Sequence, residues 1–243
     1  MDSRSLLSTK PILPRDRLIF ALDVATTAEA RALVDELGDA VTFYKLGLEL
    51  FMADGYFALV RELQERGKKI FADLKFFDVP ATVASAVANL AKRRVDCCTV
   101  HGSQAILEAA VKTKGMMKLL AVTVLTSLDR GDLDDLGFQC DVEDLVYSRA
   151  RRALALGCDG IISSGLEAAR LRRELGEKLL IITPGIRPVE NRPVDDQKRT
   201  VTMSEAFLSG ADHVVVGRPI RQAPDRRAKA DELQREIAAI FSP

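Results

Sequence analysis

Four charged side chains stand at the ends of apolar segments of the sequence, where a protein core normally holds no charge. Asp23 ends the segment LIFALD, Lys45 lies late in VTFYKLG, and Asp73 and Lys75 end KIFADLK. Because successive side chains of a strand alternate between its faces, Asp73 and Lys75 share one face. Burial costs each ion several kcal/mol, and a buried ion pair often does not recover that cost. The cluster therefore indicates catalysis, although a single charge of this kind is more often structural.

Asp78 follows Lys75 by three residues and precedes Pro80 and Thr82. Asp is favoured at a helix N-cap, because its carboxylate accepts hydrogen bonds from the first free backbone N–H groups of the helix. From position alone, a capping role and a functional role for Asp78 are equally well supported.

Apolar segments typical of β-strands recur along the chain, with segments of helical spacing between them. The eight segments are 18–23, 41–47, 69–75, 95–102, 118–125, 160–164, 179–185 and 213–218. Their near-continuous apolar character is typical of parallel strands covered on both faces. Apolar residues recur every three to four positions in 27–37 and 224–241, which predicts amphipathic helices.

This alternation predicts an α/β protein with a (β/α)8 TIM-barrel fold. The alternative is an open doubly wound sheet, but that fold usually carries GxGxxG after its first strand. Here the first strand runs into LDVATT, which contains no glycine. Enzyme groups of barrels lie at the carboxyl ends of the strands, and all four charges of the cluster fall at such ends.

Two connections, 126–141 and 185–201, are longer than ordinary loops and are expected to be functional lids. The second is rich in donors for an anion, and the eighth strand ends in Gly217-Arg218-Pro219. The donors in the second connection are Gly185, Arg187, Arg192, Gln197, Lys198 and Arg199. Because barrels often bind phosphate with the loops after strands 7 and 8, these residues predict a phosphate site. The alternative is a solvated basic loop with a structural glycine turn.

The composition is that of an ordinary globular protein. The chain has 243 residues, of which 47% are hydrophobic and 29% charged, and this length suits a single barrel domain at 17–243 after a polar lead-in at 1–16. The chain has 35 Lys and Arg residues together and 35 Asp and Glu residues together. It therefore has no basic excess, and a nucleic acid partner is not expected. No apolar run is long enough for a signal peptide or a membrane span, so no membrane association is expected.

The remaining polar candidates have simpler interpretations. The four cysteines contain no CxxC pair and the two histidines lie far apart, so no metal site is expected. Free thiols suggest a reducing compartment, the cytoplasm, and Cys97-Cys98 is expected to pack within a strand. His101 follows the fourth strand, where a ligand or a base is one alternative, but a hydrogen-bonded structural group is expected. Ser163-Ser164 lacks the GxSxG pattern of a nucleophile, and the acidic residues of 129–135 are typical of a solvated loop.

Taken together, these residues resemble the orotidine 5′-phosphate decarboxylase family in its compact bacterial type. The resemblance covers nearly the whole chain, from LIFALDV to VVVGRPI. Its most specific element is DLKFFD at 73–78, which matches the motif DxKxxD. Supporting elements in the same order are Asp23, Lys45, VLTS at 124–127, PGIRP at 184–188 and GRPI at 217–220.

The resemblance implies a cofactor-free enzyme that converts orotidine 5′-monophosphate to UMP and CO2, the last step of de novo pyrimidine nucleotide synthesis. It implies a homodimer whose active sites are shared across the interface. Lys75 would donate a proton to C6, and Asp73 would lie beside the leaving carboxylate. Asp78 and Thr82 would reach into the partner subunit's site.

The resemblance also implies a set of substrate-binding residues. Asp23 and Lys45 would bind the ribose hydroxyls and continue the chain of charges. The other implied contacts are Thr126 and Ser127 over the pyrimidine, Pro184 beside the base, and Arg187, Gln197, Gly217 and Arg218 at the phosphate.

Two positions depart from the family pattern, and two other functions stay open. Phe77 and Ala81 stand where many members have His and Asn; activity is expected to survive, while packing at the dimer interface could differ. Related barrels such as 3-keto-L-gulonate 6-phosphate decarboxylase use magnesium, and they typically carry an acid at the position of Lys45. A catalytically silent nucleotide-binding barrel is the other alternative, and the intact Asp73 and Lys75 argue against it.

Overall fold

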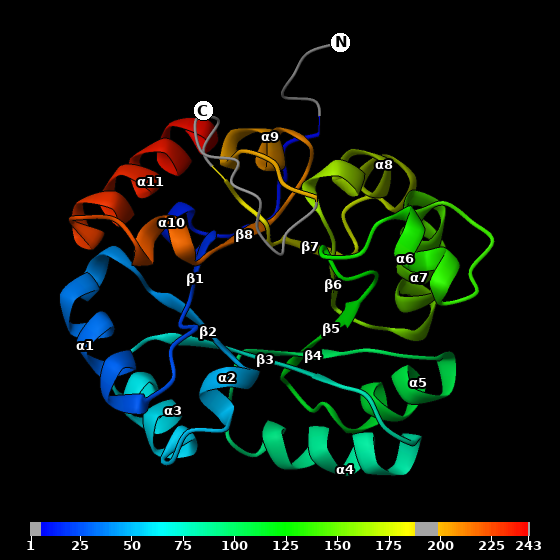
Figure 1. The fold of residues 1–243 in the computed structure, drawn as a ribbon, viewed down its shortest axis with the longest axis horizontal. Coiled ribbons are helices and arrows are strands. Elements are labelled where there is room, and N and C mark those ends of the chain that lie inside the picture. The colour runs from blue at the N-terminus through cyan, green and yellow to red at the C-terminus, as the bar shows by residue number, and fades with distance from the viewer. Residues whose placement is uncertain (1–5, 188–198, 243) are drawn as a thin grey trace.

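Eight parallel strands close into a barrel in the computed structural model, which describes residues 6–187 and 199–242. The strands follow one another around the barrel in chain order, and the helices surround them (Figure 1). They are β1 Leu18–Ala21, β2 Phe43–Gly47, β3 Lys69–Phe76, β4 Cys97–Val100, β5 Lys118–Val122, β6 Gly160–Ile162, β7 Leu180–Thr183 and β8 His213–Val216. Each lies within or extends one residue beyond a predicted segment, so the predicted (β/α)8 barrel is confirmed.

Helices follow the strands and form the outer layer. They are α1 Thr27–Leu37, α2 Leu48–Phe51, α3 Tyr56–Glu65, α4 Pro80–Ala91, α5 Gln104–Thr113, α6 Arg130–Asp135, α7 Val142–Leu156, α8 Gly165–Leu175, α9 Met203–Leu208, α10 Arg218–Arg221 and α11 Arg226–Phe241. Short 3-10 turns occupy Pro14–Asp16 and Gly38–Ala40. Helix α1 begins where Thr26 and Glu29 form a reciprocal capping box, because these side chains satisfy free N–H groups at its first turn.

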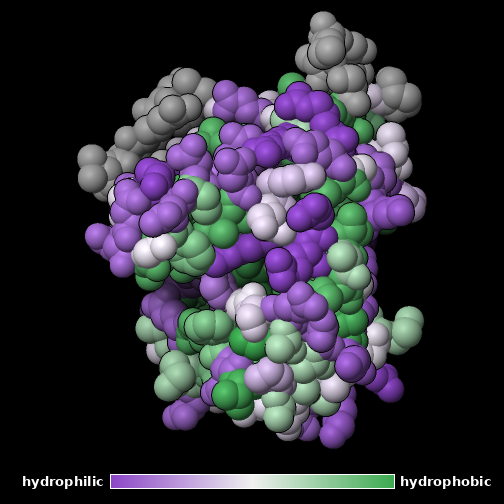
Figure 2. All heavy atoms as spheres, turned by 90° about the vertical axis from the view of Figure 1, so that its right-hand side faces the viewer, coloured by the Kyte–Doolittle hydropathy of each residue, from purple (hydrophilic) through white to green (hydrophobic). Residues whose placement is uncertain are grey.

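The hydrophobic core has two layers, as a barrel with an outer ring of helices requires. Inside the barrel, Phe43, Phe71, Leu120 and Ile182 pack with smaller neighbours. Between strands and helices, a larger cluster includes Phe20 and other wholly buried side chains. The side of the molecule around α6 and α7 is mainly hydrophilic, with hydrophobic side chains in small separate groups (Figure 2). Cys97 and Cys98 are buried in β4, as expected.

The first long connection contains a helix that the sequence interpretation did not include. Asp129 accepts a hydrogen bond from the backbone N–H of Asp132, and the Asp132 side chain accepts one from the N–H of Asp129. This capping box starts α6, so the expectation of a simple solvated loop for 129–135 is wrong. In the second connection, Ile186 pairs with Val201 in an isolated bridge; the candidates Arg192, Gln197 and Lys198 lie outside the described residues.

Part of the N-terminal lead-in contacts the barrel. Lys10 lies 3.0 Å from the buried carboxylate of Asp212, and Asp16 lies 2.7 Å from the ammonium of Lys69. In the part of the chain that the structure describes, no helix has both the length and the apolar character needed to cross a bilayer.

Candidate active site

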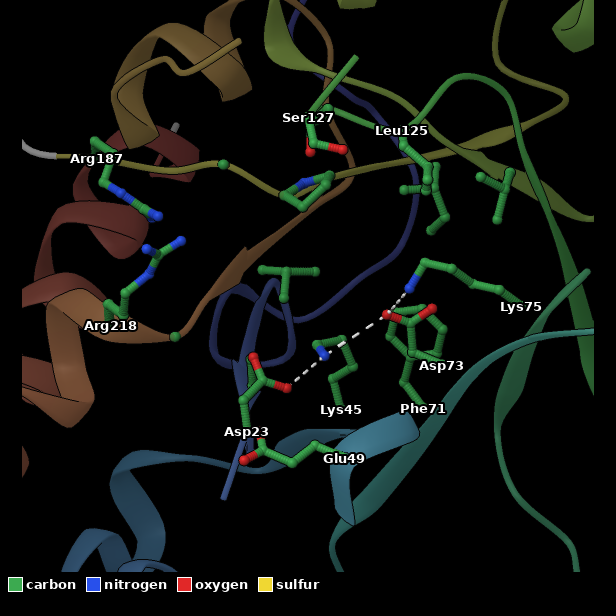
Figure 3. A pocket seen from close by; sticks show the side chains of 18 of the residues that line it. Asp23, Lys45, Glu49, Phe71, Asp73, Lys75, Leu125, Ser127, Arg187 and Arg218 are labelled. Carbon is green, nitrogen blue, oxygen red and sulfur yellow. Dashed lines mark hydrogen bonds and ion pairs between the residues drawn. The ribbon is translucent and has the colours of Figure 1, made fainter. Parts of the chain in front are cut away.

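A cavity of about 500 Å³ opens at the carboxyl ends of the strands. Ten of the residues that the resemblance implies for the site line it, and they come from β2 and β3 and from the segments after β1, β5, β7 and β8 (Figure 3). They are Asp23, Lys45, Asp73, Lys75, Thr126, Ser127, Pro184, Arg187, Gly217 and Arg218. The cavity is therefore where the barrel brings together positions that the sequence scatters over almost 200 residues.

One wall of this cavity is a row of charges with alternating sign. The ammonium of Lys45 lies 2.9 Å from Asp23 and 3.6 Å from Asp73, and the ammonium of Lys75 lies 2.8 Å from Asp73 (Figure 3). The side chains of Lys45 and Asp73 are only 12% and 10% exposed, whereas that of Lys75 is 33% exposed. The two inner charges are thus held by their neighbours, and Lys75 presents its ammonium to the open cavity.

Strand pairing explains how the row forms. Lys45 pairs with Ala21 of β1 on one side and with Phe71 of β3 on the other, so its side chain stands between the two carboxylates. Gly47 follows two residues later, and a Cβ atom there would lie 3.1 Å from the Lys45 ammonium. A side chain at position 47 would therefore crowd the row, and glycine leaves the ammonium room.

The two inner charges of the row, Lys45 and Asp73, are stabilised in their ionised forms by their neighbours. Burial alone raises the pKa of Asp73, but the neighbouring Lys45 and Lys75 outweigh it, so the pKa of Asp73 lies below its ordinary value. Burial alone lowers the pKa of Lys45, but Asp73 and Asp23 reverse this effect and the pKa of Lys45 is raised. Both groups are therefore charged at neutral pH.

The opposite end of the cavity is basic. Arg187, after β7, and Arg218, at the start of α10, point toward each other across it (Figure 3). Gly217 precedes Arg218, and a Cβ atom there would lie 3.3 Å from Ala21 Cβ, so a side chain at position 217 would be crowded. Guanidinium groups offer forked donors to phosphate oxygens, so this end suits an anionic group.

Arg199 does not belong to that basic end, although the sequence analysis grouped it there. Its guanidinium lies 2.6 Å from the buried carboxylate of Glu167 and donates to the carbonyl oxygens of Val124 and Leu125. Its side chain is 9% exposed. Arg199 is outside the cavity lining, because Glu167 of α8 and two carbonyl oxygens of the loop after β5 hold its guanidinium.

Asp78 and Thr82 also lie outside the cavity lining. Both are exposed at the start of α4, next to Phe77 and Val79, which are 68% and 62% exposed. The carboxylate of Asp78 accepts a hydrogen bond from the N–H of Val79, and Val79 is the N-cap of α4 with no side-chain cap. The capping interpretation of Asp78 is therefore wrong.

His101 is not the hydrogen-bonded group that the sequence analysis expected. Its Nδ1 is buried with no partner among the described residues, and its ring packs edge-on against Phe77 at 5.2 Å. Burial, together with the positive charges of Arg149 and Lys75, lowers the pKa of His101. A neutral ring is what this environment favours.

Several lining residues were not among those expected from the sequence. Glu49 and Arg221 add charge to the cavity, and the apolar part of its lining includes Phe71, Ile162 and Val215. The guanidinium of Arg221 donates to the backbone carbonyl of Asp23. Glu49 follows β2 by two residues, so its position just past a strand end was a usable signal. Among the described residues, no three His, Cys, Asp or Glu side chains gather as a metal site would require.

The fold and this cavity define a barrel enzyme with a charge row at one end of its site and paired arginines at the other. Residues 16–233 match the family described as orotidine 5′-phosphate decarboxylase / HUMPS. The chain therefore belongs to that family, as the resemblance implied. The prediction that it is an orotidine 5′-phosphate decarboxylase enzyme is confirmed as well.

Individual relatives agree over nearly the full length. The chain is 61% identical to the orotidine 5′-phosphate decarboxylase of Methylococcus capsulatus, with 98% of each chain covered. It is 51% identical to the protein of the same name from Xanthomonas axonopodis pv. citri, with 95% of this chain and 96% of the relative covered. The crystal structure of orotidine 5′-phosphate decarboxylase from Lactobacillus acidophilus matches with a TM-score of 0.79 and 33% identity, over 91% of this chain and 99% of that one.

Proposed function

We propose that this chain decarboxylates orotidine 5′-monophosphate to UMP and CO2, the last step of de novo pyrimidine nucleotide synthesis, without a metal or an organic cofactor. The observation that carries the proposal is the row Asp23–Lys45–Asp73–Lys75 at one end of a cavity whose other end holds Arg187 and Arg218. A nucleotide also has two different ends, with its reacting base at one end and its phosphate at the other.

Lys75 is the proton donor in this mechanism. The bond between C6 and the carboxylate breaks, CO2 leaves, and the electron pair stays on C6 in an in-plane orbital that the ring delocalises poorly. An ammonium beside C6 stabilises that charge and then transfers a proton from Nζ to C6. The neutral amine of Lys75 regains its proton from solvent. Its 33% exposure and its place in the cavity lining support this role.

Asp73 forms an ion pair with Lys75 at 2.8 Å and lies beside the departing carboxylate. Its low pKa means that it is ionised when substrate enters. Two carboxylates near one another repel, and this repulsion is relieved when CO2 departs. Lys45 continues the row and, with Asp23, reaches the ribose hydroxyls; their 2.9 Å contact supports a paired role.

Substrate orientation comes from both ends of the cavity. Thr126 and Ser127 contact the pyrimidine, and Pro184 lines the base pocket. The phosphate is bound by Arg187, Arg218, the backbone at Gly217, and Gln197, which lies outside the described residues. Binding energy gained at the phosphate, far from C6, can offset unfavourable placement of the substrate carboxylate at Asp73.

The active enzyme is a cytoplasmic homodimer in which Asp78 and Thr82 complete the partner's site. Their exposure, and that of the neighbouring Phe77 and Val79, supports this arrangement, because an apolar surface beside an active site is typical of an interface. The molecule that this enzyme binds is its nucleotide substrate, and neither a nucleic acid polymer nor a membrane takes part in the reaction.

The experiment that tests this function follows the ultraviolet absorbance of orotidine 5′-monophosphate mixed with the purified protein, with and without EDTA. Loss of the orotate absorbance in both samples, with UMP formed, is the expected result. Loss only in the sample without EDTA would indicate a metal-dependent enzyme. No change in either sample, with the protein folded and binding UMP, would indicate a silent nucleotide-binding barrel.

A further inference from the structure

The carboxyl end of β3 departs from regular strand pairing where Asp73 and Lys75 stand. Ala72 pairs with Cys98 of β4, and the next pair is Phe76 with Val100. Four steps along β3 therefore match two steps along β4, and the backbone bulges between them. Lys75 lies at this bulge with a φ of 47°, a left-handed conformation that is unfavourable for a residue with a Cβ atom.

Thr99 is the β4 residue opposite this bulge, and its hydroxyl occupies the place of the missing backbone contacts. The N–H of Lys75 donates to Thr99 Oγ1 at 2.9 Å, and Thr99 Oγ1 donates to Asp73 Oδ1 at 2.8 Å. The direction of both bonds is determined, because an N–H can only donate and an ionised carboxylate can only accept. Thr99 is completely buried, so no solvent molecule competes at this contact.

These two hydrogen bonds determine the arrangement of the reactive pair. The hydroxyl of Thr99 occupies one carboxylate oxygen of Asp73, which leaves Oδ2 facing both ammonium groups, at 2.8 Å from Lys75 and 3.6 Å from Lys45. The same hydroxyl holds the main chain of Lys75 in its left-handed conformation, from which the side chain reaches back to Asp73. One buried atom thus constrains the backbone of the donor and the rotation of the carboxylate.

We infer that Thr99 is a positioning residue for the decarboxylation, acting through Asp73 and Lys75 rather than on the substrate. The inference rests on the proposed function. Thr99 is absent from the cavity lining, so it does not contact the nucleotide. Its loss therefore affects the geometry of the reacting groups more than substrate binding, and the hydroxyl is the part that matters.

Thr99→Val removes the hydroxyl at nearly constant volume, and Thr99→Ser keeps it. We expect kcat to fall about ten- to a hundredfold in the Val variant, because small displacements of reacting groups cost rate on this scale. KM for orotidine 5′-monophosphate should change less than about threefold, since uniform binding is not affected, and the Ser variant should recover most of the rate. A kcat of the Val variant within twofold of the wild type would overturn the inference.

Thr123→Val is the matched control. Thr123 is also completely buried, and its Val variant loses the hydrogen bond from Oγ1 to the carbonyl of Ile162 at 2.7 Å, but among the described residues this hydroxyl makes no hydrogen bond to the charge row. If both Val variants lower Tm alike but only Thr99→Val lowers kcat, the effect is one of positioning. An equal fall of kcat in both would show that Thr99 is merely structural.

A second measurement makes the inference independent of substrate. Amide hydrogen exchange at Lys75, followed by NMR, should accelerate at least about tenfold in Thr99→Val but not in Thr99→Ser, because only the Val variant leaves that N–H without its acceptor. Unchanged exchange would contradict the inference even if the wild type decarboxylates its substrate. Failure of the wild type to turn over would instead contradict the proposed function, while the exchange result would still decide whether Thr99 holds Lys75.

Discussion

At the residue scale, the charge row is the feature from which the chemistry follows. Its four members were identifiable in the sequence, because Asp and Lys at the ends of apolar strands are costly unless they are used. Their order and distances were not identifiable, since these depend on strand register. The room that Gly47 leaves for the Lys45 ammonium was equally hidden, because no local pattern shows that a side chain two residues earlier on the same strand folds over the glycine.

The interpretations of Arg199 and Asp78 failed because each depended on contacts that only the folded chain establishes. Arg199 was grouped with phosphate donors on composition, yet it binds Glu167, 32 residues away, and backbone carbonyls more than 70 residues away. Asp78 was weighed as a helix cap, but α4 starts with Val79 as its N-cap. Sequence patterns indicate what a residue can do, and only the fold shows which acceptor is near.

Arg218→Ala tests the phosphate end of the cavity. Removing a charged hydrogen bond costs about 1.5–3 kcal/mol, so kcat/KM for orotidine 5′-monophosphate should fall about ten- to 150-fold. The matched control is orotidine itself, which lacks the phosphate and whose slow turnover should be the same in wild type and variant. An equal loss with both substrates would remove Arg218 from the phosphate site.

At the element scale, the loops after β5 and β7 are joined by a buried contact. Arg199 bonds to the carbonyl oxygens of Val124 and Leu125, and its own N–H donates to the carbonyl of Thr126. The loop that carries Thr126 and Ser127 is thus attached to the end of the connection 185–201, whose first part carries Arg187. The sequence showed that both connections were long, but neither this link nor α6 could be predicted, because each depends on tertiary contacts or on reciprocal caps.

Arg199→Met should destabilise this junction strongly. The variant leaves Glu167 buried without its partner, and breaking a buried pair costs about 3–5 kcal/mol. Burial raises the pKa of Glu167 even with Arg199 present, so Glu167→Gln in the same chain should recover part of the loss. Urea unfolding of the single and double variants measures both effects. If Arg199→Met is as stable as the wild type, the Arg199–Glu167 pair contributes nothing to the free energy of unfolding.

At the scale of the whole molecule, the barrel gathers strand ends that lie far apart in the chain. The alternation of strands and helices predicted this architecture correctly, because parallel strands buried on both faces are almost continuously apolar. The sequence could not show which loops would meet, nor how large the cavity would be. The exposed Phe77 and Val79 beside Asp78 become visible as a surface only when the chain is folded.

Sharing of the active site between subunits is tested by mixing two inactive variants, Lys75→Ala and Asp78→Ala. A hybrid dimer carries both defects in one site and an intact second site, because a two-fold interface exchanges the same residues in both directions. With random exchange, about one quarter of the wild-type activity should return. Mass spectrometry shows whether the subunits have exchanged. If they have exchanged and no activity returns, the shared site is contradicted.

The central claim is that Lys75 supplies the proton to C6 from within the charge row, and the rate of orotidine 5′-monophosphate decarboxylation by Lys75→Ala tests it most directly. Loss of the ammonium removes both the donor and its stabilising charge, so kcat should fall at least about a thousandfold. Tm and UMP binding should remain close to those of the wild type, which shows that the barrel and the phosphate end are intact. A folded Lys75→Ala variant that retains kcat within tenfold of the wild type would contradict the account.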